Sequence, residues 1–311
     1  MRVIVLVTYV SAVVFVVAVL ARFVKYQTMP IHLRWELYPV AHEKGRAHYG
    51  GSYLEELDWW TKPRKASLLG ELKVMIPEIV LLAGVREHNR SHWLRSFPFH
   101  FGLYLLAGLI GLLAIGAVAT LTGAAITADA GVLGRAVFHA TYVIGWSGLG
   151  LGFLGSLALL GRRAFNVDYR EYTKQSDYLN LVFFVITFGV AIGAHTFGDS
   201  QFVQLRAYVE SLLSVDLSYR GTPLGVAEIV LASLLVAYIP LTHMSHFFTK
   251  WFMYHDIRWS DEPSRRGGNI EKKVDRALKY SVSWAAPHIR GDGKKNWVDV
   301  ATSGVEEESK Q

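Results

Sequence analysis

Two histidines three residues apart, His243 and His246, lie near the end of an apolar stretch that runs from about residue 223 to 249. His100 lies a few residues into another such stretch, from about 97 to 121. A titratable side chain inside a bilayer is costly, and metal ligation is one reason to keep an imidazole there. We therefore expect His100 and His246 to be the axial ligands of a haem iron, with His243 as the alternative to His246. The simpler interpretation of His100 is an interfacial histidine that hydrogen-bonds a backbone carbonyl.

A second set of polar residues lies at the opposite ends of the apolar stretches from His100 and His246. His139 lies one helical turn after Arg135, His195 lies near the end of a stretch from about 178 to 197, and Glu228 lies near the start of the last stretch. An acid inside a span is a candidate functional residue, and we expect Glu228 to accept a proton or to pair with Arg135. The set predicts a second haem on His139 and His195, a quinone pocket that includes Glu228 and Arg135, or both. Ordinary interfacial residues are the simpler interpretation of His139, Arg135 and His195.

The composition indicates an integral membrane protein. Of the 311 residues, 51% are hydrophobic and nine are Trp, which is too apolar for a soluble domain of this length. Cysteine is absent from the sequence. This excludes disulfides, an iron–sulfur cluster held by thiolates of this chain, and a haem attached through a C-x-x-C-H motif. A redox group in this chain would therefore be held non-covalently.

Five apolar stretches are long enough to cross a bilayer, and they predict an all-α integral membrane bundle of five transmembrane helices. The first stretch is expected to be retained rather than cleaved, because basic and aromatic residues follow it in place of a small-residue cleavage site. The expected spans are 3–21, about 97–121, about 136–160, about 178–197 and about 223–249. The expected organisation is a first transmembrane helix over 1–21, a partner-facing loop over 22–96, a four-helix haem-binding domain over 97–249 and a tail over 250–311.

Shorter features are expected in the loop and the tail. Residues 73–85 are too short to span and contain Pro77, which we expect to interrupt an interfacial or partner-facing helix. Residues 269–280 predict a short helix, and residues 281–297 predict an arm punctuated by Gly and Pro. The loop histidines lack metal-ligand spacing and are expected to be solvated or to cap helices; they are His42, His48, His88 and His92. Glycines in residues 142–156 allow close helix packing or the approach of a flat cofactor.

The distribution of basic residues predicts the orientation. Of the 32 Lys and Arg residues, 28 lie in the loop 22–96, after the third span or in the tail, and four lie on the other side. Positive charge favours the cytoplasmic side, so we expect a prokaryotic inner-membrane protein with its N-terminus outside and its loop and tail in the cytoplasm. The first pair of histidines then lies near the inner face, and the second polar set near the outer face. The net charge of +6 is thus a topology signal, and no nucleic-acid partner is expected.

Three segments carry a resemblance to a known family. They are FPFHFGLYLLAGLIG (97–111), GLGLGFLGSLALLGRRAF (148–165) and IPLTHMSHFFTKWFMYHDIRWSDEP (239–263). They resemble membrane cytochrome b subunits related to the gamma subunit of respiratory nitrate reductase, and most closely the branch of sulfate reducers that accompanies heterodisulfide-reductase-like iron–sulfur subunits. The resemblance implies a b-type haem on His100 and His246. The histidines that hold the family's outer haem correspond here to Ile110 and Glu228, so that haem is not implied.

These observations lead to one functional expectation. The chain is expected to be a respiratory membrane subunit that passes electrons between menaquinone and a cytoplasmic iron–sulfur partner subunit through haem b, with one haem expected and a second left open. Because the chain has no cysteine, the onward cluster belongs to another chain. The reverse direction of electron flow, or flow inward from a periplasmic multihaem cytochrome c, remains an alternative. Two further alternatives are a cofactor-free proton or solute transporter that uses the intramembrane His and Glu residues, and a structural anchor for a soluble complex.

Overall fold

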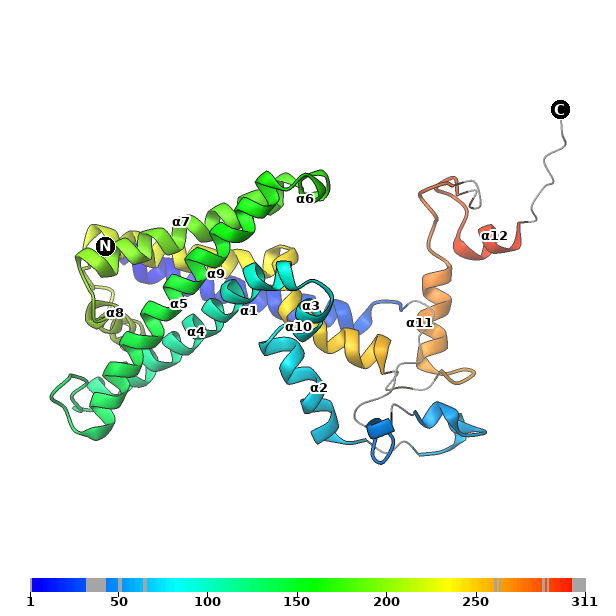
Figure 1. The fold of residues 1–311 in the computed structure, drawn as a ribbon, viewed down its shortest axis with the longest axis horizontal. Coiled ribbons are helices and arrows are strands. Elements are labelled where there is room, and N and C mark those ends of the chain that lie inside the picture. The colour runs from blue at the N-terminus through cyan, green and yellow to red at the C-terminus, as the bar shows by residue number, and fades with distance from the viewer. Residues whose placement is uncertain are drawn as a thin grey trace. The chain divides into compact units, whose positions relative to one another are not determined.

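The computed structural model describes residues 2–31, 43–49, 52–63, 66–259, 262, 264–286, 289 and 291–303. These residues form a helical protein (Figure 1). Five helices are long and apolar enough to cross a membrane; they are Val3–Thr28, Arg90–Leu121, Val132–Phe165, Gln175–Phe197 and Pro223–Leu241. The chain is therefore a multi-span helical membrane protein, and the expected all-α fold class is confirmed. It divides into two compact units, the first made of Met1–Val19 and Ile76–Ser245, the second of Leu20–Met75 and His246–Gln311.

The first unit is a bundle of antiparallel helices. Its long helices are α4 (Arg90–Leu121), α5 (Val132–Phe165), α7 (Gln175–Phe197) and α9 (Pro223–Tyr238), and the shorter α6 (Val167–Tyr172) and α8 (Val203–Leu213) lie in their connections. Helix α4 packs on α5 and α8, α5 on α7, and α7 on α9. The first part of α1 (Arg2–Thr28) joins them through Thr8, whose hydroxyl lies 2.6 Å from the Tyr208 hydroxyl and 2.7 Å from that of Ser233. We call the start of α4 and the end of α5 the Arg162 end, and the end of α7 and the start of α9 the His195 end.

Side-chain caps fix where several helices begin. The Asn89 side chain accepts a hydrogen bond from His92 N at the start of α4, and Asn166 accepts one from Tyr169 N at the start of α6. The Thr222 hydroxyl accepts from Gly225 N, and Pro223 occupies the first position of α9, where its missing N–H costs nothing. These caps fix the residues at which α4, α6 and α9 begin.

Glycines bring α4 and α5 into backbone contact. A Cβ atom on Gly102 would overlap the backbone of Gly152, and one on Gly155 would overlap the backbone of Phe99. A Cβ atom on Gly148 would press on Leu105 and Leu106 of α4. We call Gly102, Gly148, Gly152 and Gly155 the glycine seam. Of the two expectations for the glycines of residues 142–156, close helix packing explains these positions.

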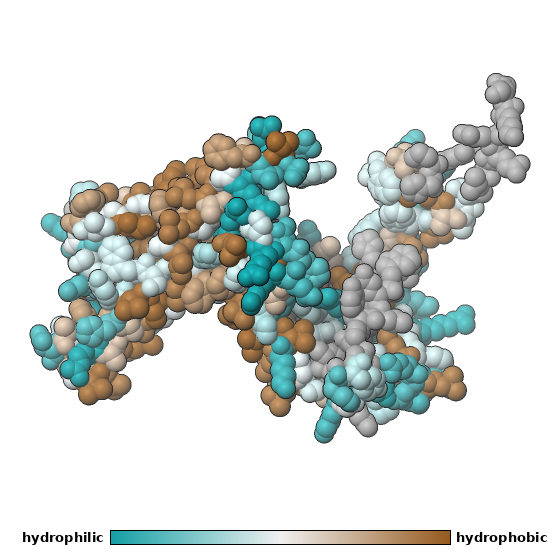
Figure 2. All heavy atoms as spheres, in the orientation of Figure 1, coloured by the Kyte–Doolittle hydropathy of each residue, from teal (hydrophilic) through white to brown (hydrophobic). Residues whose placement is uncertain are grey.

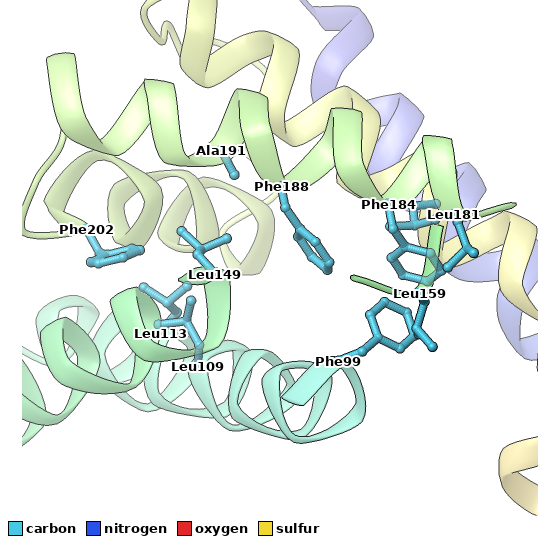
Figure 3. Close-up of a cluster of buried hydrophobic side chains, with 11 residues drawn as sticks. Phe99, Leu109, Leu113, Leu149, Leu159, Leu181, Phe184, Phe188, Ala191 and Phe202 are labelled. Carbon is cyan, nitrogen blue, oxygen red and sulfur yellow. The ribbon is translucent and has the colours of Figure 1, made fainter. Parts of the chain in front are cut away.

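Apolar side chains of α4, α5 and α7 meet between these helices (Figure 3). Phe99 of α4 meets Phe184 of α7 edge to face, with ring centroids 4.9 Å apart. Leu159 and Leu181 lie beside this pair, and toward the His195 end the cluster continues through Leu109, Leu113, Leu149, Phe188, Ala191 and Phe202 (Figure 3). Leu235 of α9 also belongs to it. Because lipid is as apolar as these side chains, close packing rather than transfer from water is what stabilises the bundle. Hydrophobic side chains also cover the flanks of α4, α5 and α7, as a lipid-facing surface requires (Figure 2).

The fifth span ends earlier than the sequence predicts. Helix α9 tightens into a 3₁₀ turn over Ile239–Leu241, and Thr242 then has an extended backbone with φ −111° and ψ −177°. A second 3₁₀ turn (His243–Ser245) precedes α10 (His246–Phe252). The expectation of one uninterrupted helix from 223 to 249 is therefore wrong. Pro240 explains the break, because it cannot donate the hydrogen bond that would continue the helix.

Residues 68–88 form two helices, α2 (Leu68–Val80) and α3 (Ala83–His88). Pro77 lies inside α2, so the expected interruption at Pro77 is wrong; the helix continues for three more residues and breaks at Leu82, which has φ +51°. A proline within the last turn leaves only one carbonyl of the helix without its usual partner. Glu78 accepts a hydrogen bond from Gly84 N at 2.7 Å, which holds the turn between the two helices.

In the second unit, aromatic side chains of α10 pack on the last turns of α1. Phe252 lies against Phe23 and Tyr26, with ring centroids 5.3 and 5.7 Å apart. The predicted short helix at 269–280 is confirmed as α11 (Asn269–Leu278). Its Lys273 and Arg276 donate hydrogen bonds to the carbonyl oxygens of Gln27 and Thr28, which lie at the end of α1. Basic groups at that position satisfy carbonyls that have no partner within α1.

The second unit contains two short helical elements that the sequence did not predict. A π-helical turn, Met253–Arg258, follows α10. Helix α12 (Trp297–Thr302) begins where the arm over 281–297 was expected to end, and Asn296 and Asp299 cap it reciprocally. The arm itself is partly outside the described residues, as is His42.

Candidate functional site

A buried histidine and a buried glutamate meet at the His195 end of the bundle. His195 in the last turn of α7 is 1% exposed, and Glu228 near the start of α9 is 8% exposed. The His195 Nε2 atom lies 2.9 Å from Glu228 Oε1. Both residues were expected near one face of the membrane, and the structure brings their side chains into direct contact.

The hydrogen bond of the second ring nitrogen of His195, Nδ1, shows which nitrogen carries a hydrogen. His195 Nδ1 lies 2.9 Å from the backbone carbonyl oxygen of Asp199. A carbonyl can only accept a hydrogen bond, so Nδ1 carries the hydrogen. The contact between Nε2 and Oε1 then needs one further proton, held either as imidazolium with carboxylate or as imidazole with carboxylic acid. The pair therefore holds one proton between two buried side chains.

Asp199 holds this arrangement from the connection between α7 and α8. Its carboxylate accepts hydrogen bonds from Val203 N at 2.7 Å and Leu205 N at 2.9 Å, which caps α8. The same residue supplies the carbonyl that orients His195. Asp199 is thus a positioning residue that sequence reasoning missed. The only signal for it was its place four residues after His195.

Phe202 closes the site on its apolar side. Its ring centroid lies 4.0 Å from that of His195, and the side chain is fully buried. The Phe202 ring occupies the space that a side chain on Gly145 of α5 would need. Phe202 has φ +58°, a conformation that costs a bulky residue of order 1–3 kcal/mol. The backbone turn that places this ring is therefore maintained by the surrounding packing.

Two tyrosines outside the spans lie near the pair. Burial, together with the charges of Asp199 and Glu228, raises the pKa of Tyr219 to about 12. Burial also raises the pKa of Tyr208, against the hydrogen bond with Thr8, which lowers it. Both phenols therefore remain protonated at neutral pH. The Tyr219 hydroxyl donates to the Gln204 carbonyl at 3.2 Å.

Arg206 of α8 is a second buried charge at this end. It is 7% exposed, and burial lowers its pKa. Its Nη2 donates to the Ile126 carbonyl at 3.1 Å, whereas its buried Nη1 has no hydrogen-bond partner among the described residues. Its side chain packs where Gly116 of α4 leaves room. From the sequence, Arg206 was counted only as one of the four basic residues on the outer side, and its burial was not predicted.

The structure does not bring Arg135 and His139 to this site. Both are exposed on the surface of α5. Glu228 is paired with His195 instead of Arg135. Because both ring nitrogens of His195 are engaged, an iron on His195 would have to displace one of these contacts.

His100 lies on α4 toward the Arg162 end. Its Nδ1 lies 2.8 Å from the Ser96 carbonyl oxygen and 3.3 Å from the Ser96 hydroxyl. The carbonyl again requires a hydrogen on Nδ1, so Nε2 is the nitrogen without a hydrogen when the imidazole is neutral. A backbone carbonyl on the rear nitrogen is how proteins fix the tautomer and orientation of histidines that bind metals.

The remaining two candidates follow the break at Thr242. His243 is 61% exposed, and its Nε2 lies 3.3 Å from Asp177 Oδ1 at the start of α7. His246 is exposed in the first turn of α10.

The loop histidine His88 is exposed as expected, and its Nδ1 lies 2.9 Å from the Gly84 carbonyl oxygen. His92, expected to be solvated, instead stacks on Tyr169 of α6 with ring centroids 6.1 Å apart.

Comparison with protein-family models, curated proteins and solved structures finds no match. The description that follows from the structure itself is a multi-span helical membrane protein with a buried His–Glu pair at one end of its bundle.

Proposed function

We propose that this chain is a membrane cytochrome b subunit that passes electrons between the menaquinone pool and a cytoplasmic iron–sulfur subunit. The observation that carries the proposal is the imidazole of His100 within a span, with its Nδ1 hydrogen bonded to the Ser96 carbonyl. That bond supports a neutral histidine whose Nε2 is the donor atom. Neutral imidazole is the ligand that a b-type haem uses.

The proposed donor set consists of two imidazoles. His100 is the first, and on the sequence evidence His246 is the second, with His243 as its alternative. The haem, when bound, would supply one-electron transfer. The chain's own part is to hold His100 in one tautomer through Ser96, because a rotated ring would present the wrong nitrogen.

The buried pair supports a role in proton handling. Oxidising a quinol releases protons as well as electrons, so a quinone site needs an acceptor. Glu228 and His195 share a proton in the folded protein, and an incoming proton can be taken up at Glu228 while Asp199 keeps the imidazole in place. Arg135 and His139, which the sequence placed in the same region, are left outside this role.

An optical spectrum tests the haem. The purified protein reduced with dithionite should show a b-type α band, and His100→Ala should remove it. His88→Ala is the matched control, because His88 also makes a hydrogen bond to the carbonyl four residues earlier but is exposed. His246→Ala and His243→Ala, measured side by side, identify the second ligand. A colourless wild-type protein with no bound iron would overturn the proposal.

A proton or solute transporter is the second candidate. The specific observation in its favour is the same buried proton-sharing pair, which a proton-coupled carrier would also use. Such a protein would have no haem band and would dissipate a pH gradient across a vesicle membrane. Glu228→Gln would abolish that flux.

A further inference from the structure

A groove lies where α2, α3 and the start of α4 meet, within the first unit. Its volume is about 410 Å³, and it is lined by Pro77, Leu81, Ala83, Arg86, Glu87 and Arg90. One wall is apolar, and the other carries two guanidinium groups and one carboxylate. Figure 2 shows hydrophilic side chains gathered near α3 and the start of α4.

The groove is held in shape by hydrogen bonds between its walls. Trp93 Nε1 of α4 donates to the Leu81 carbonyl at 2.8 Å, and the Tyr104 hydroxyl donates to the Ile79 carbonyl at 2.7 Å. Leu82 sits at the bend with φ +51°, a left-handed conformation that is uncommon for leucine. Backbone of this kind persists only where its surroundings determine it, and it is concentrated at functional sites.

The two arginines are available to an anion. Arg86 lies over the Trp93 ring, 5.5 Å from its centroid, and both Arg86 and Arg90 are exposed. Within the described part of the chain, neither guanidinium forms an ion pair. Glu87 reduces the local charge, but two cations against one anion leave the groove positive.

Arg90 begins α4, the helix that contains the second candidate span, so the groove is expected near the membrane–water boundary. Exposed apolar side chains extend from the same elbow: Ile76 is 53%, Val80 is 38% and Leu81 is 45% exposed. A ligand that matches these features has an anionic head for the arginines and an apolar chain for the wall formed by Pro77 and Leu81.

We infer that this groove binds an anionic phospholipid, with its phosphate between Arg86 and Arg90 and an acyl chain along Pro77 and Leu81. Basic pockets beside transmembrane helices hold anionic headgroups in this way. This inference is independent of the proposed haem, since no histidine ligand takes part.

Native mass spectrometry of the full-length protein in mild detergent tests the inference. After delipidation, the protein is titrated with phosphatidylglycerol and, separately, with phosphatidylcholine of the same acyl chains. The wild type should retain one phosphatidylglycerol more tightly than any phosphatidylcholine. Arg86→Gln combined with Arg90→Gln should weaken that retention about 30-fold. Arg135→Gln combined with Arg220→Gln is the control of equal charge, because these exposed arginines lie elsewhere, and it should bind like the wild type.

Excess inorganic phosphate distinguishes the source of the anion. It should not displace the lipid, because it lacks the acyl chain; full displacement would make the groove a phosphate site and overturn the lipid assignment. Unchanged retention by the Arg86/Arg90 double variant, or equal retention of phosphatidylcholine, would also overturn it. Helical circular dichroism confirms that the variant is folded, and Leu81→Gln, which keeps both arginines, should weaken retention as well.

Discussion

The His195–Glu228 pair shows at the level of single residues why depth in a membrane does not define a site. Arg135, His139, His195 and Glu228 share a layer by residue count, but successive residues of a helix are rotated by about 100°. Only His195 and Glu228 turn toward each other; the other two face outward. The layer could be predicted from the sequence, whereas the facing of each side chain depends on how the helices are rotated.

Replacing one member of this pair should lower the stability of the protein more than replacing both. His195→Ala leaves Glu228 buried without its partner, and we expect the free energy of unfolding to fall by about 3–5 kcal/mol. The double variant His195→Leu and Glu228→Leu replaces the pair by apolar groups and should regain most of that loss. Unfolding in detergent with increasing dodecyl sulfate measures both. Equal losses for the single and double variants would contradict a coupled pair.

Glu228 should also matter for quinol chemistry if the proposed function holds. Glu228→Gln keeps the size of the side chain but cannot take up a proton, so haem reduction by a menaquinol analogue should slow by about 10²–10⁴-fold. Stopped-flow absorbance at the α band follows the rate. Glu171→Gln, an exposed acid on α6, should leave it unchanged. Equal rates in wild type and Glu228→Gln would remove Glu228 from the mechanism.

The raised pKa of Tyr219 predicts that the stability of the protein falls at high pH. Its pKa is raised to about 12 in the folded protein, above the value of about 10 for an unfolded chain. Its contribution to stability is therefore complete below pH 10 and is lost as pH rises toward 12. Difference absorbance at 295 nm should show that Tyr219→Phe removes a component near pH 12. Loss of a component near pH 10 instead would contradict the shift.

At the level of elements, the glycine seam makes a prediction with an internal control. Gly155→Ala places a methyl group against the backbone of Phe99 in α4, and overpacking of this kind costs about 1–3 kcal/mol. Gly150→Ala changes the same helix at a position with open space around it, and should be neutral or stabilising by up to about 1 kcal/mol. Thermal unfolding of the two variants compares them directly. A Gly155→Ala protein as stable as Gly150→Ala would contradict the seam.

The breaks in helices were harder to predict than the helices. Each of the first four expected spans lies within one helix, because an apolar run of about 20 residues has few alternatives to a span. The fifth run stays apolar through Phe247 and Phe248, which hides the break that Pro240 causes at Thr242. Pro77 has the opposite outcome, since its helix continues through it. Whether a proline ends a helix depends on which group donates a hydrogen bond to the freed carbonyl, and that donor is set by tertiary structure.

At the level of the whole molecule, the absence of cysteine allows a direct test of orientation. Ser214 follows α8 at the His195 end, and Ser264 follows the π-helical turn. From the distribution of basic residues we expect Ser214→Cys to react with a membrane-impermeant maleimide added to intact cells. Ser264→Cys should react only after the cells are permeabilised. Labelling of both variants in intact cells, or of Ser264→Cys alone, would contradict the predicted orientation.

The backbone contact along Gly102 and Gly152 also limits how this protein can move. Alternating access requires helices to rock apart and close again on the other side. Where the main chains touch at these glycines, no side chain lies between the helices to repack, so we expect α4 and α5 to move together. Any opening toward either side of the membrane is then expected at the contacts of α7, α9 or α1.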